Sequence, residues 1–409
     1  MSLAPTQPPY PRRRALLATA FLAAGALACG GDDADADGTG TTSGPLYAVG
    51  TGVYGPSGSN AYLRLVEDIA LDGAQISLDE AREFPGNSDM DMYEGSALVA
   101  SGDAPTITKY AVAEDGTLEA GAQISFLNYG QASAAFYYNK MVAANKAYMV
   151  NGVGQVIVWN PTEMAIEGTI TLPTLEARTG LRVVSALVDR GGIVADGKFY
   201  LPMYWTDDQY AQRAPDSALV VVDIATDTVT GTIAAPCPAL DYATRGDDGM
   251  LYFSNWTGGP GAYHVLGTAQ NCVAVVNPTT EVVSTMSFAS IAGGHEAAAF
   301  AYAGDGTFVM SVFDEVRADV ANATDPFTPV AGTNWQLWRY DPADGSSSPV
   351  PGVDWNSGAV IHTTVDDTFY SMVPGADYAS TVVYGHENDG TAKAAFGIDG
   401  WSFRMFRVR

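Results

Sequence analysis

Two stretches of the sequence resemble parts of active sites, and each lacks a feature that its chemistry requires. His295-Glu296 begins like the helix of a zinc protease, but the position of the second histidine ligand, four residues later, is Ala299. Residues 50–55 (GTGVYG) match the glycine pattern of a dinucleotide-binding turn, and residues 56–60 (PSGSN) cannot begin the helix that must follow. The sequence therefore predicts neither kind of enzyme.

Other catalytic chemistry is not favoured either. The nucleophile motif G-x-S-x-G does not occur, and the cysteines lack the spacing of a zinc site. Pairs of acids such as Asp247-Asp248 are explained better by turns than by acid–base catalysis. The four histidines are too scattered to predict a metal site: His264, His295, His362 and His386. We predict no catalytic residue, no bound metal and no cofactor.

Arginine and aromatic side chains in the loops instead indicate binding. Together they suit a planar, anionic or aromatic ligand, which they would hold by ion pairing and stacking. The alternative is that these residues cap the strands and pair with neighbouring carboxylates. The predicted binding residues are Arg178, Arg182, Arg213, Arg245, Trp205, Tyr210, Tyr242, Trp256, His295 and Trp355.

A repeated pattern of strands must position these loops. Each copy has a tight polar turn, a strand with aromatic residues, a variable loop, an apolar strand ending near Asp or Asn, and one more strand. Clear copies span residues 195–233, 247–286, 305–341 and 365–384, and weaker copies span 144–172, 96–126 and 46–84. Units of about 40 to 55 residues have the length of a four-stranded propeller blade.

The two ends of the repeat region predict how the ring closes. The unit that begins at Leu46 lacks an innermost strand, whereas Ser402–Val408 is a spare strand at the other end. Placing the spare strand inside the first unit gives an all-β, seven-bladed β-propeller over residues 46–409. An open solenoid is the alternative.

Propeller geometry also predicts where the loops lie. In each blade, the loop between the second and third strands and the connection to the next blade lie on the same rim. The loop between the second and third strands is long in three consecutive units, at residues 204–217, 254–271 and 312–335. Long ordered loops are often functional. The predicted connections would bring to this rim Tyr93, Glu94, Tyr129, Arg178, Arg182, Tyr242, Arg245, His295, Glu296, Trp355 and Trp401.

The N-terminal residues have the pattern of an export signal. Three arginines, Arg12 to Arg14, precede the apolar run Ala15–Ala28, which is too short for the roughly 20 residues of a spanning helix. Ala28 followed by Cys29 resembles the lipobox of bacterial lipoproteins, with Leu27 one place closer to the cysteine than is usual. That resemblance implies a lipid on Cys29. It divides the chain into a signal peptide (1–28), a flexible tether (29–45) and the propeller (46–409); a signal peptide cleaved without lipidation is the alternative.

Charge and cysteine content restrict the partners. Loss of segment 1–28 with its three arginines takes the net charge from −26 to −29, which argues against nucleic acid and against docking on anionic lipid. The membrane is therefore expected to be contacted only through the lipid. Cys237 and Cys272 are predicted to pair, since disulfides persist in exported proteins. Two separate buried thiols are the alternative.

The layout resembles bacterial propeller lipoproteins encoded beside TonB-dependent siderophore receptors. The similar segments are residues 47–52 (YAVGTG), 59–62 (SNAY), 198–204 (KFYLPMY) and 215–222 (PDSALVVV). The resemblance implies a non-enzymatic protein that holds a ferric siderophore for a receptor in the outer membrane. A protein-interaction scaffold at that membrane is the alternative, followed by a propeller lyase or hydrolase, because a fold does not fix a function.

Overall fold

The computed structural model describes residues 44–55, 58–151 and 154–409. The predicted signal peptide, Cys29 and nearly all of the predicted tether lie outside these residues. Among the residues described, no helix has the length and apolar character needed to cross a membrane.

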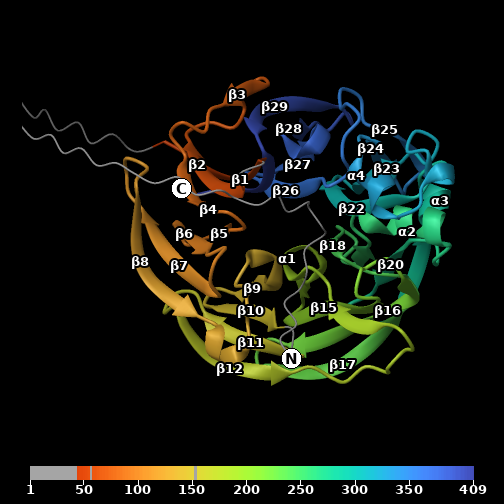
Figure 1. The fold of residues 1–409 in the computed structure, drawn as a ribbon, viewed down its shortest axis with the longest axis horizontal. Coiled ribbons are helices and arrows are strands. Elements are labelled where there is room, and N and C mark those ends of the chain that lie inside the picture. Colours follow the sequence, from red (N-terminus) through yellow and green to blue (C-terminus); the bar gives the residue numbers. More distant parts are fainter. Residues whose placement is uncertain (1–43, 56–57, 152–153) are drawn as a thin grey trace, which may run out of the picture.

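The described strands form seven sheets around a common axis, which confirms the predicted seven-bladed β-propeller (Figure 1). The first strand named in each blade is the innermost one. Blade 1 contains β30 (Trp401–Arg407), β1 (Tyr47–Gly55), β2 (Gly58–Val66) and β4 (Arg82–Pro85). Blade 2 contains β5 (Asp89–Tyr93), β6 (Ser96–Ala100), β7 (Thr106–Val112) and β8 (Leu118–Ser125). Blade 3 contains β9 (Asn139–Ala143), β10 (Lys146–Asn151), β11 (Gln155–Asn160) and β12 (Ala165–Thr171).

The remaining blades follow in chain order. Blade 4 contains β13 (Arg182–Ser185) and β14 (Ile193–Ala195), both beside β15 (Lys198–Thr206), then β16 (Arg213–Asp223) and β17 (Thr228–Ala235). Blade 5 contains β18 (Tyr242–Arg245), β19 (Leu251–Ser254), β20 (Cys272–Val276) and β21 (Val283–Ser287). Blade 6 contains β22 (Ala297–Gly304), β23 (Thr307–Phe313), β24 (Trp335–Asp341) and β25 (Ser346–Pro349). Blade 7 contains β26 (Ile361–Val365), β27 (Thr368–Pro374), β28 (Ser380–His386), β29 (Ala392–Asp399) and β3 (Ala74–Ile76).

The ring is closed twice. As predicted, the C-terminal strand β30 is the innermost strand of blade 1, where Trp401 pairs with Gly52 and Arg407 with Tyr47. In addition, the chain between β2 and β4 crosses to blade 7 and adds β3 as a parallel outer strand beside β29. A Cβ at Gly397 would lie 1.9 Å from the Gln75 side chain, so β29 needs glycine there to let β3 approach.

The blades are held by apolar side chains packed between neighbouring sheets. Middle strands such as β11 and β16 are almost continuously buried, because an adjacent blade covers each of their faces. Between blades 3 and 4, for example, the Tyr148 ring packs edge-on against Phe199 at 5.6 Å. Burial of this kind favours folding by about 25 cal/mol per Å² of apolar surface.

The two rims of the propeller differ in structure. We call the rim with the second-to-third-strand loops and the blade-to-blade connections the front rim, and the other the back rim. On the back rim, two-residue turns join the first two strands of several blades, as at Asp196-Gly197 and Asp305-Gly306, where both residues have positive φ. Helices lie on the front rim, except for α1, which interrupts the inner edge of blade 4. The helical segments are α1 (Val188–Gly191), α2 (Gly258–Leu266), α3 (Phe288–Ile291), α4 (Phe327–Ala331) and the 3-10 turns η1 (Leu127–Tyr129), η2 (Phe136–Tyr138), η3 (Val320–Asn322) and η4 (Ala376–Tyr378).

Candidate ligand-binding site at the channel mouth

The innermost edge of blade 4 is broken by a helical turn. Strands β13 and β14 both pair with β15, and α1 lies between them and points toward the centre of the ring (Figure 1). Gly191 at its end packs on blade 5, where an added Cβ would lie 3.1 Å from the carbonyl carbon of Asp241. The turn therefore carries Asp189 and Arg190 into the channel. A regular strand would instead have placed them along the channel wall.

Below the mouth, charged side chains from four blades meet in a cluster that we call the axial ion cluster. Arg404 of β30 lies 2.8 Å from Asp189 and 3.5 Å from Asp89 of β5. Lys140 of β9 donates to the backbone oxygen of Asp189 at 2.7 Å. Asp91 belongs to the cluster through its electrostatic contacts with Arg404 and Lys140. The cluster joins blades 1 to 4 across the axis.

Burial shifts the pKa values of several charged groups in this cluster. It raises the pKa of Asp91 to about 6 and also raises that of Asp89, in each case against the opposing effect of Arg404. For Asp189, burial acts in the same direction but is outweighed by Arg190 and Arg404, so its pKa is lowered. Burial also lowers the pKa of Lys140. Burial therefore disfavours the charged forms of Asp89, Asp91 and Lys140, whereas Asp189 is held ionised by the two arginines beside it.

Above the cluster, Arg190 lies against two indole rings. Its guanidinium carbon is 4.4 Å from the ring centre of Trp256 and 5.7 Å from that of Trp401, and the two indoles are stacked at 6.2 Å. Only 9% of the Arg190 side chain is exposed, and its buried Nε lies 3.5 Å from Asp189 Oδ2, an ion pair without a hydrogen bond. A cation on aromatic faces with an unused donor is an arrangement that can receive an anionic or aromatic group.

A second guanidinium lies on the neighbouring wall, at the start of β16. Arg213 Nη2 is 2.5 Å from the place that a Cβ of Gly258 would take, next to the N-terminus of α2. Its Nε donates to the backbone oxygen of Tyr210 at 3.4 Å. Within the described part of the chain, no carboxylate lies within ion-pair distance of Arg213. Its charge acts on Asp241 from farther away and opposes the rise in the pKa of that group.

Asp241 completes this wall. The hydroxyl of Tyr204 donates to its Oδ2 at 3.4 Å, whereas its buried Oδ1 has no hydrogen-bond partner. Burial raises the pKa of Asp241 to about 6, although Arg213, Tyr204 and Arg190 oppose the rise. We call Arg190, Arg213, Asp241, Tyr204, Trp256 and Trp401 the mouth site.

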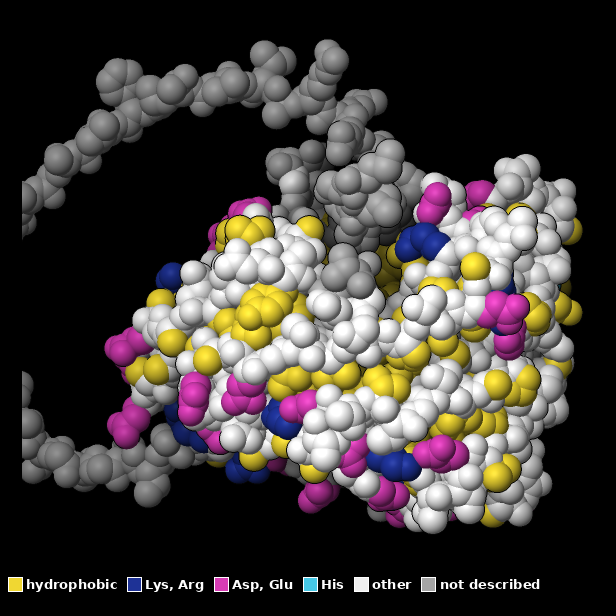
Figure 2. Space-filling view, turned by 90° about the horizontal axis from the view of Figure 1, so that it is seen from below, with side chains coloured by type: hydrophobic (Ala, Val, Ile, Leu, Met, Phe, Trp, Pro, Cys, Tyr) yellow, Lys and Arg dark blue, Asp and Glu magenta, His cyan; other side chains and the backbone are white. Residues whose placement is uncertain are grey.

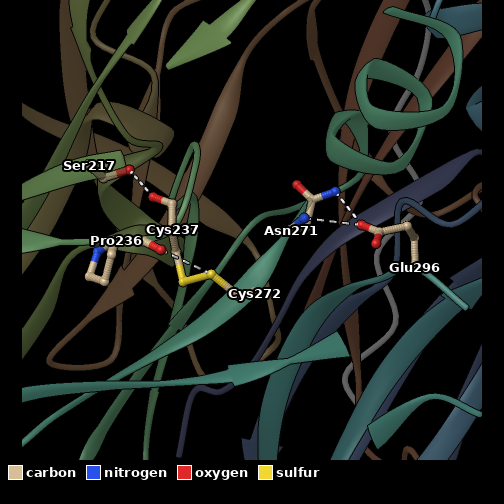
Figure 3. Close-up of a disulfide and its surroundings, with 6 residues drawn as sticks. All are labelled: Ser217, Pro236, Cys237, Asn271, Cys272 and Glu296. Carbon is tan, nitrogen blue, oxygen red and sulfur yellow. Dashed lines mark hydrogen bonds between the residues drawn. A yellow bond between two sulfur atoms is a disulfide. The ribbon is translucent and has the colours of Figure 1, made fainter. Parts of the chain in front are cut away.

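The long loop of blade 5 that carries Trp256 and α2 is fastened at its far end. Cys237 and Cys272 form a disulfide, with Cα atoms 5.5 Å apart, that joins the connection after blade 4 to the first residue of β20 (Figure 3). Next to it, the backbone and side-chain N–H groups of Asn271 donate to the buried carboxylate of Glu296 at 3.2 and 2.6 Å (Figure 3). These contacts fix the end of the loop to blades 4 and 6.

Several predicted residues lie on the front rim, where carboxylates already pair with them. Arg178 makes two hydrogen bonds to Asp216, at 2.6 and 2.7 Å, and stacks on Trp205 at 3.6 Å. Arg182 is 3.1 Å from Asp208 and lies over the Tyr210 ring at 4.8 Å. At these positions, the structure matches the alternative of capping and pairing that the sequence left open.

Of the other predicted residues, His295 and Trp355 lie on the front rim away from the mouth site, and Tyr242 lies beside the mouth site. His295 Nδ1 is 2.9 Å from Glu315, and Arg317 lies over Trp355 at 4.5 Å. Tyr242 is buried and accepts a hydrogen bond from the backbone N–H of His362 at 3.3 Å. In the residues that the structure describes, no group of three or more His, Cys, Asp or Glu is arranged to hold a metal ion.

The predicted placement of Arg245, Tyr93 and Glu94 on the front rim is wrong. Arg245 ends β18 and pairs with Leu251 at the back rim, where it is 3.0 Å from Asp196. Tyr93 and Glu94 belong to the back-rim turn between β5 and β6. All three follow the first strand of a blade, and the sequence pattern misassigned them to the connection that precedes it. Arg245 is therefore at the opposite end from Arg182 and Trp256.

Sequence reasoning missed Arg190, Asp241 and the axial ion cluster. One signal was available for α1, because Asp189-Arg190-Gly191-Gly192 replaces the apolar pattern expected of an inner strand. Nothing in the sequence places Arg404 beside Asp189, since the two are brought together only by ring closure. On the side of the ring seen in Figure 2, acidic side chains are interspersed with lysine and arginine.

Comparison with known proteins identifies the fold alone. No protein-family model matches the sequence, and no curated protein matches it. Among solved structures, the chain resembles the periplasmic gluconolactonase PpgL of Pseudomonas aeruginosa, with a TM-score of 0.52 and 11% identity, over 89% of this chain and 99% of that one. It also resembles a protein from Lactobacillus plantarum, with a TM-score of 0.52 and 10% identity, over the same shares of the two chains.

Proposed function

We propose that this protein is an exported, non-enzymatic β-propeller that holds a planar anionic ligand at the mouth of its channel. The observation that carries the proposal is the position of Arg190. Its guanidinium lies against Trp256 and close to Trp401, and its Nε makes an ion pair with Asp189 at 3.5 Å but no hydrogen bond. A planar group can stack on the indoles while its negative charge meets this cation.

The charges around the mouth support an anionic ligand, although the whole protein is acidic at −26. Arg213 faces the mouth without a carboxylate partner within the described residues, and Arg404 lies below. The pKa values of Asp91 and Asp241 are raised to about 6, so these two groups lose negative charge as the pH falls toward 5. Low-dielectric walls strengthen this local field despite the opposite net charge.

The ligand class that we propose to test first is a ferric catecholate siderophore. Such complexes are anionic with flat aromatic faces, as the mouth site requires, and the sequence resembles siderophore-acquisition propellers. In this proposal Cys29 carries the lipid that retains the protein at the outer membrane, and a TonB-dependent receptor takes up the ligand. A scaffold protein is the second candidate, and it would use the front rim without binding a small molecule.

Fluorescence titration of the mature protein, purified in detergent, tests the proposal. Trp256 and Trp401 belong to the mouth site, so ferric catecholates should quench tryptophan emission on binding. Arg190→Gln and Arg213→Gln should each raise Kd about tenfold, the effect of losing one charge-assisted contact of about 1.4 kcal/mol. Arg245→Gln is the matched control on the back rim and should leave Kd unchanged.

Three outcomes would count against the proposal. Absence of quenching across a panel of ferric and iron-free catecholates would favour the scaffold. Equal loss of affinity in Arg245→Gln would place binding elsewhere. Turnover of a lactone or sugar substrate, measured in the same preparations, would indicate an enzyme. Circular dichroism of each variant separates loss of binding from loss of folding.

A further inference from the structure

The mouth site contains a polar atom that its own contacts do not explain. Asp241 Oδ1 is buried and accepts no hydrogen bond of normal geometry, although the Tyr204 hydroxyl reaches Oδ2 and the backbone N–H of Leu187 is near enough to lower the pKa of the carboxyl group. An unsatisfied buried acceptor costs about 1–3 kcal/mol, and folded proteins rarely keep one. A ligand that donates a hydrogen bond would remove this cost.

Arg213 and Asp241 act on each other electrostatically without direct contact. They attract each other strongly enough for Arg213 to oppose the rise in the pKa of Asp241, yet they form no ion pair. Arg213 is held instead by the backbone oxygen of Tyr210 and by its contact with Gly258. The guanidinium of Arg213 offers donors and the carboxyl group of Asp241 an acceptor without a hydrogen bond, and the two groups are close enough to interact electrostatically.

The two groups recognise opposite hydrogen-bonding character. The guanidinium of Arg213 binds an anionic oxygen, for which its planar set of N–H donors is suited. The unsatisfied oxygen of Asp241 requires a donor such as a hydroxyl or an amino group. The aromatic remainder of such a ligand would extend toward Trp256 and Arg190, which lie 4.4 Å apart.

We propose that Asp241 is a specificity-determining residue that selects aromatic acids bearing a hydroxyl or amino donor beside their anionic group. The inference rests on the proposed binding function and names the ligand class of the same site. It assigns the anion to Arg213, the donor to Asp241, and the ring to the indoles and Arg190.

The proposal predicts how ligand preference changes with pH. An ionised carboxylate accepts a hydrogen bond more strongly than a protonated one. The groups that act on Asp241 are Arg213 from β16, Tyr204 from β15, and Arg190 with the backbone of Leu187 from the α1 segment. Since the arginines stay charged, ionisation of Asp241 with a pKa of about 6 governs the change. Preference for a donor-bearing ligand should therefore be greater at pH 7.5 than at pH 5.

The test compares three probes that differ only in ring substituents. These are 2,3-dihydroxybenzoate, 2,3-dimethoxybenzoate, which has no donors and is larger, and benzoate, which has no donors and is smaller. The wild-type protein should bind the dihydroxy acid at least about tenfold more tightly than either of the others, the discrimination expected from one hydrogen bond to a charged group. Asp241→Leu should abolish that preference while benzoate binding stays the same or improves, because the variant removes a negative charge.

Two variants and the folding controls make the result decisive. Asp241→Asn keeps an acceptor oxygen of similar shape and should keep part of the preference. Asp208→Asn removes an exposed front-rim carboxylate, which is paired with Arg182, and should change nothing. Near-ultraviolet circular dichroism and urea unfolding of each variant report whether the propeller is intact.

The outcomes separate this inference from the proposed function. If the wild-type protein binds all three probes equally well and Arg213→Gln weakens them all, selection by Asp241 is overturned while binding at the mouth stands. If neither these acids nor ferric catecholates bind, both proposals fail. If the preference persists in Asp241→Leu, another residue supplies the acceptor and the assignment to Asp241 is wrong.

Discussion

The front and back rims carry the same types of charged residue, but these residues make different contacts. On the back rim, charged side chains join neighbouring blades in pairs, such as Lys198 with Glu281 at 2.7 Å and Lys146 with Asp227 at 2.9 Å. At the channel mouth, Arg190 lies beside indoles with only a 3.5 Å contact to Asp189, and Arg213 lies beside a helix terminus without a carboxylate partner in the described residues. Farther out on the front rim, Arg178 and Arg182 are paired with carboxylates. The number of arginines on a rim therefore says less about binding than whether carboxylates are already paired with those arginines.

The difference follows from the length of the connections. Back-rim turns of two residues leave little freedom, and their side chains can reach only the adjacent turn. The front-rim loops are long enough to carry helices, and the turn α1 displaces Arg190 into the channel. The following variants test this difference between the rims, in order of decreasing expected effect.

The largest effect is expected from removing the cation that holds the axial ion cluster together. Arg404→Met would leave Asp189 and Asp89 buried without their main partner, and we expect a loss of about 3–5 kcal/mol in the free energy of unfolding, measured in urea. Arg245→Gln on the back rim removes an exposed ion pair and should not shift the midpoint measurably. Equal losses for the two variants would show that the cluster is no more important than a surface pair.

Removing the disulfide should have the next largest effect, and it should act on the front rim. The double variant Cys237→Ser/Cys272→Ser opens a link across 35 positions of sequence and should cost about 2–4 kcal/mol of unfolding free energy. Because the link fastens the end of the loop that carries Trp256, proteolysis should cut first within residues 255–271. Cleavage that begins at the back-rim turns instead would contradict the assigned role of the disulfide.

A smaller effect is expected where α2 meets the loop of blade 6. A Cβ at Gly261 would lie 1.9 Å from the backbone oxygen of Pro326, so Gly261→Ala should cost about 1–3 kcal/mol through overpacking. Gly168→Ala on β12 is the control, since no atom lies within 4 Å of its Cβ position. Differential scanning calorimetry should show a lower Tm for the first variant and little change for the second.

The smallest effect concerns the pH dependence of anion binding. Asp91 and Asp241, with pKa values raised to about 6, lose their negative charge as the pH falls from 7.5 to 5. Affinity for a ligand that stays anionic should therefore rise on acidification, by roughly threefold if the change in local field is worth about 0.7 kcal/mol. Isothermal titration of benzoate checks the sign, and weaker binding at pH 5 would contradict it. The Asp91→Asn variant should show a flatter dependence.

Prediction from sequence succeeded where the pattern is local. Asp-Gly turns with positive φ, as at Asp196-Gly197, mark the back rim, and an apolar strand follows each of them, which is enough to count blades. The spare strand at residues 402–408 also identified how the ring closes, and β30 takes the predicted position. The predicted binding residues were only partly brought together, because Arg245 lies on the wrong rim and Arg178 and Arg182 have partners of their own.

By itself, the sequence determined the all-β class, the seven repeated units and the long loops of blades 5 and 6, because turn chemistry and alternating apolar residues act over a few positions. The loop of blade 4, predicted to be long over residues 204–217, is only residues 207–212, because β15 and β16 extend into it. Only the tertiary structure decided which arginines remain available, because that depends on contacts between residues far apart in the chain. Arg404 reaches Asp189 only after the C-terminal strand enters blade 1, and Arg190 meets Trp256 only because α1 leaves the inner edge of blade 4.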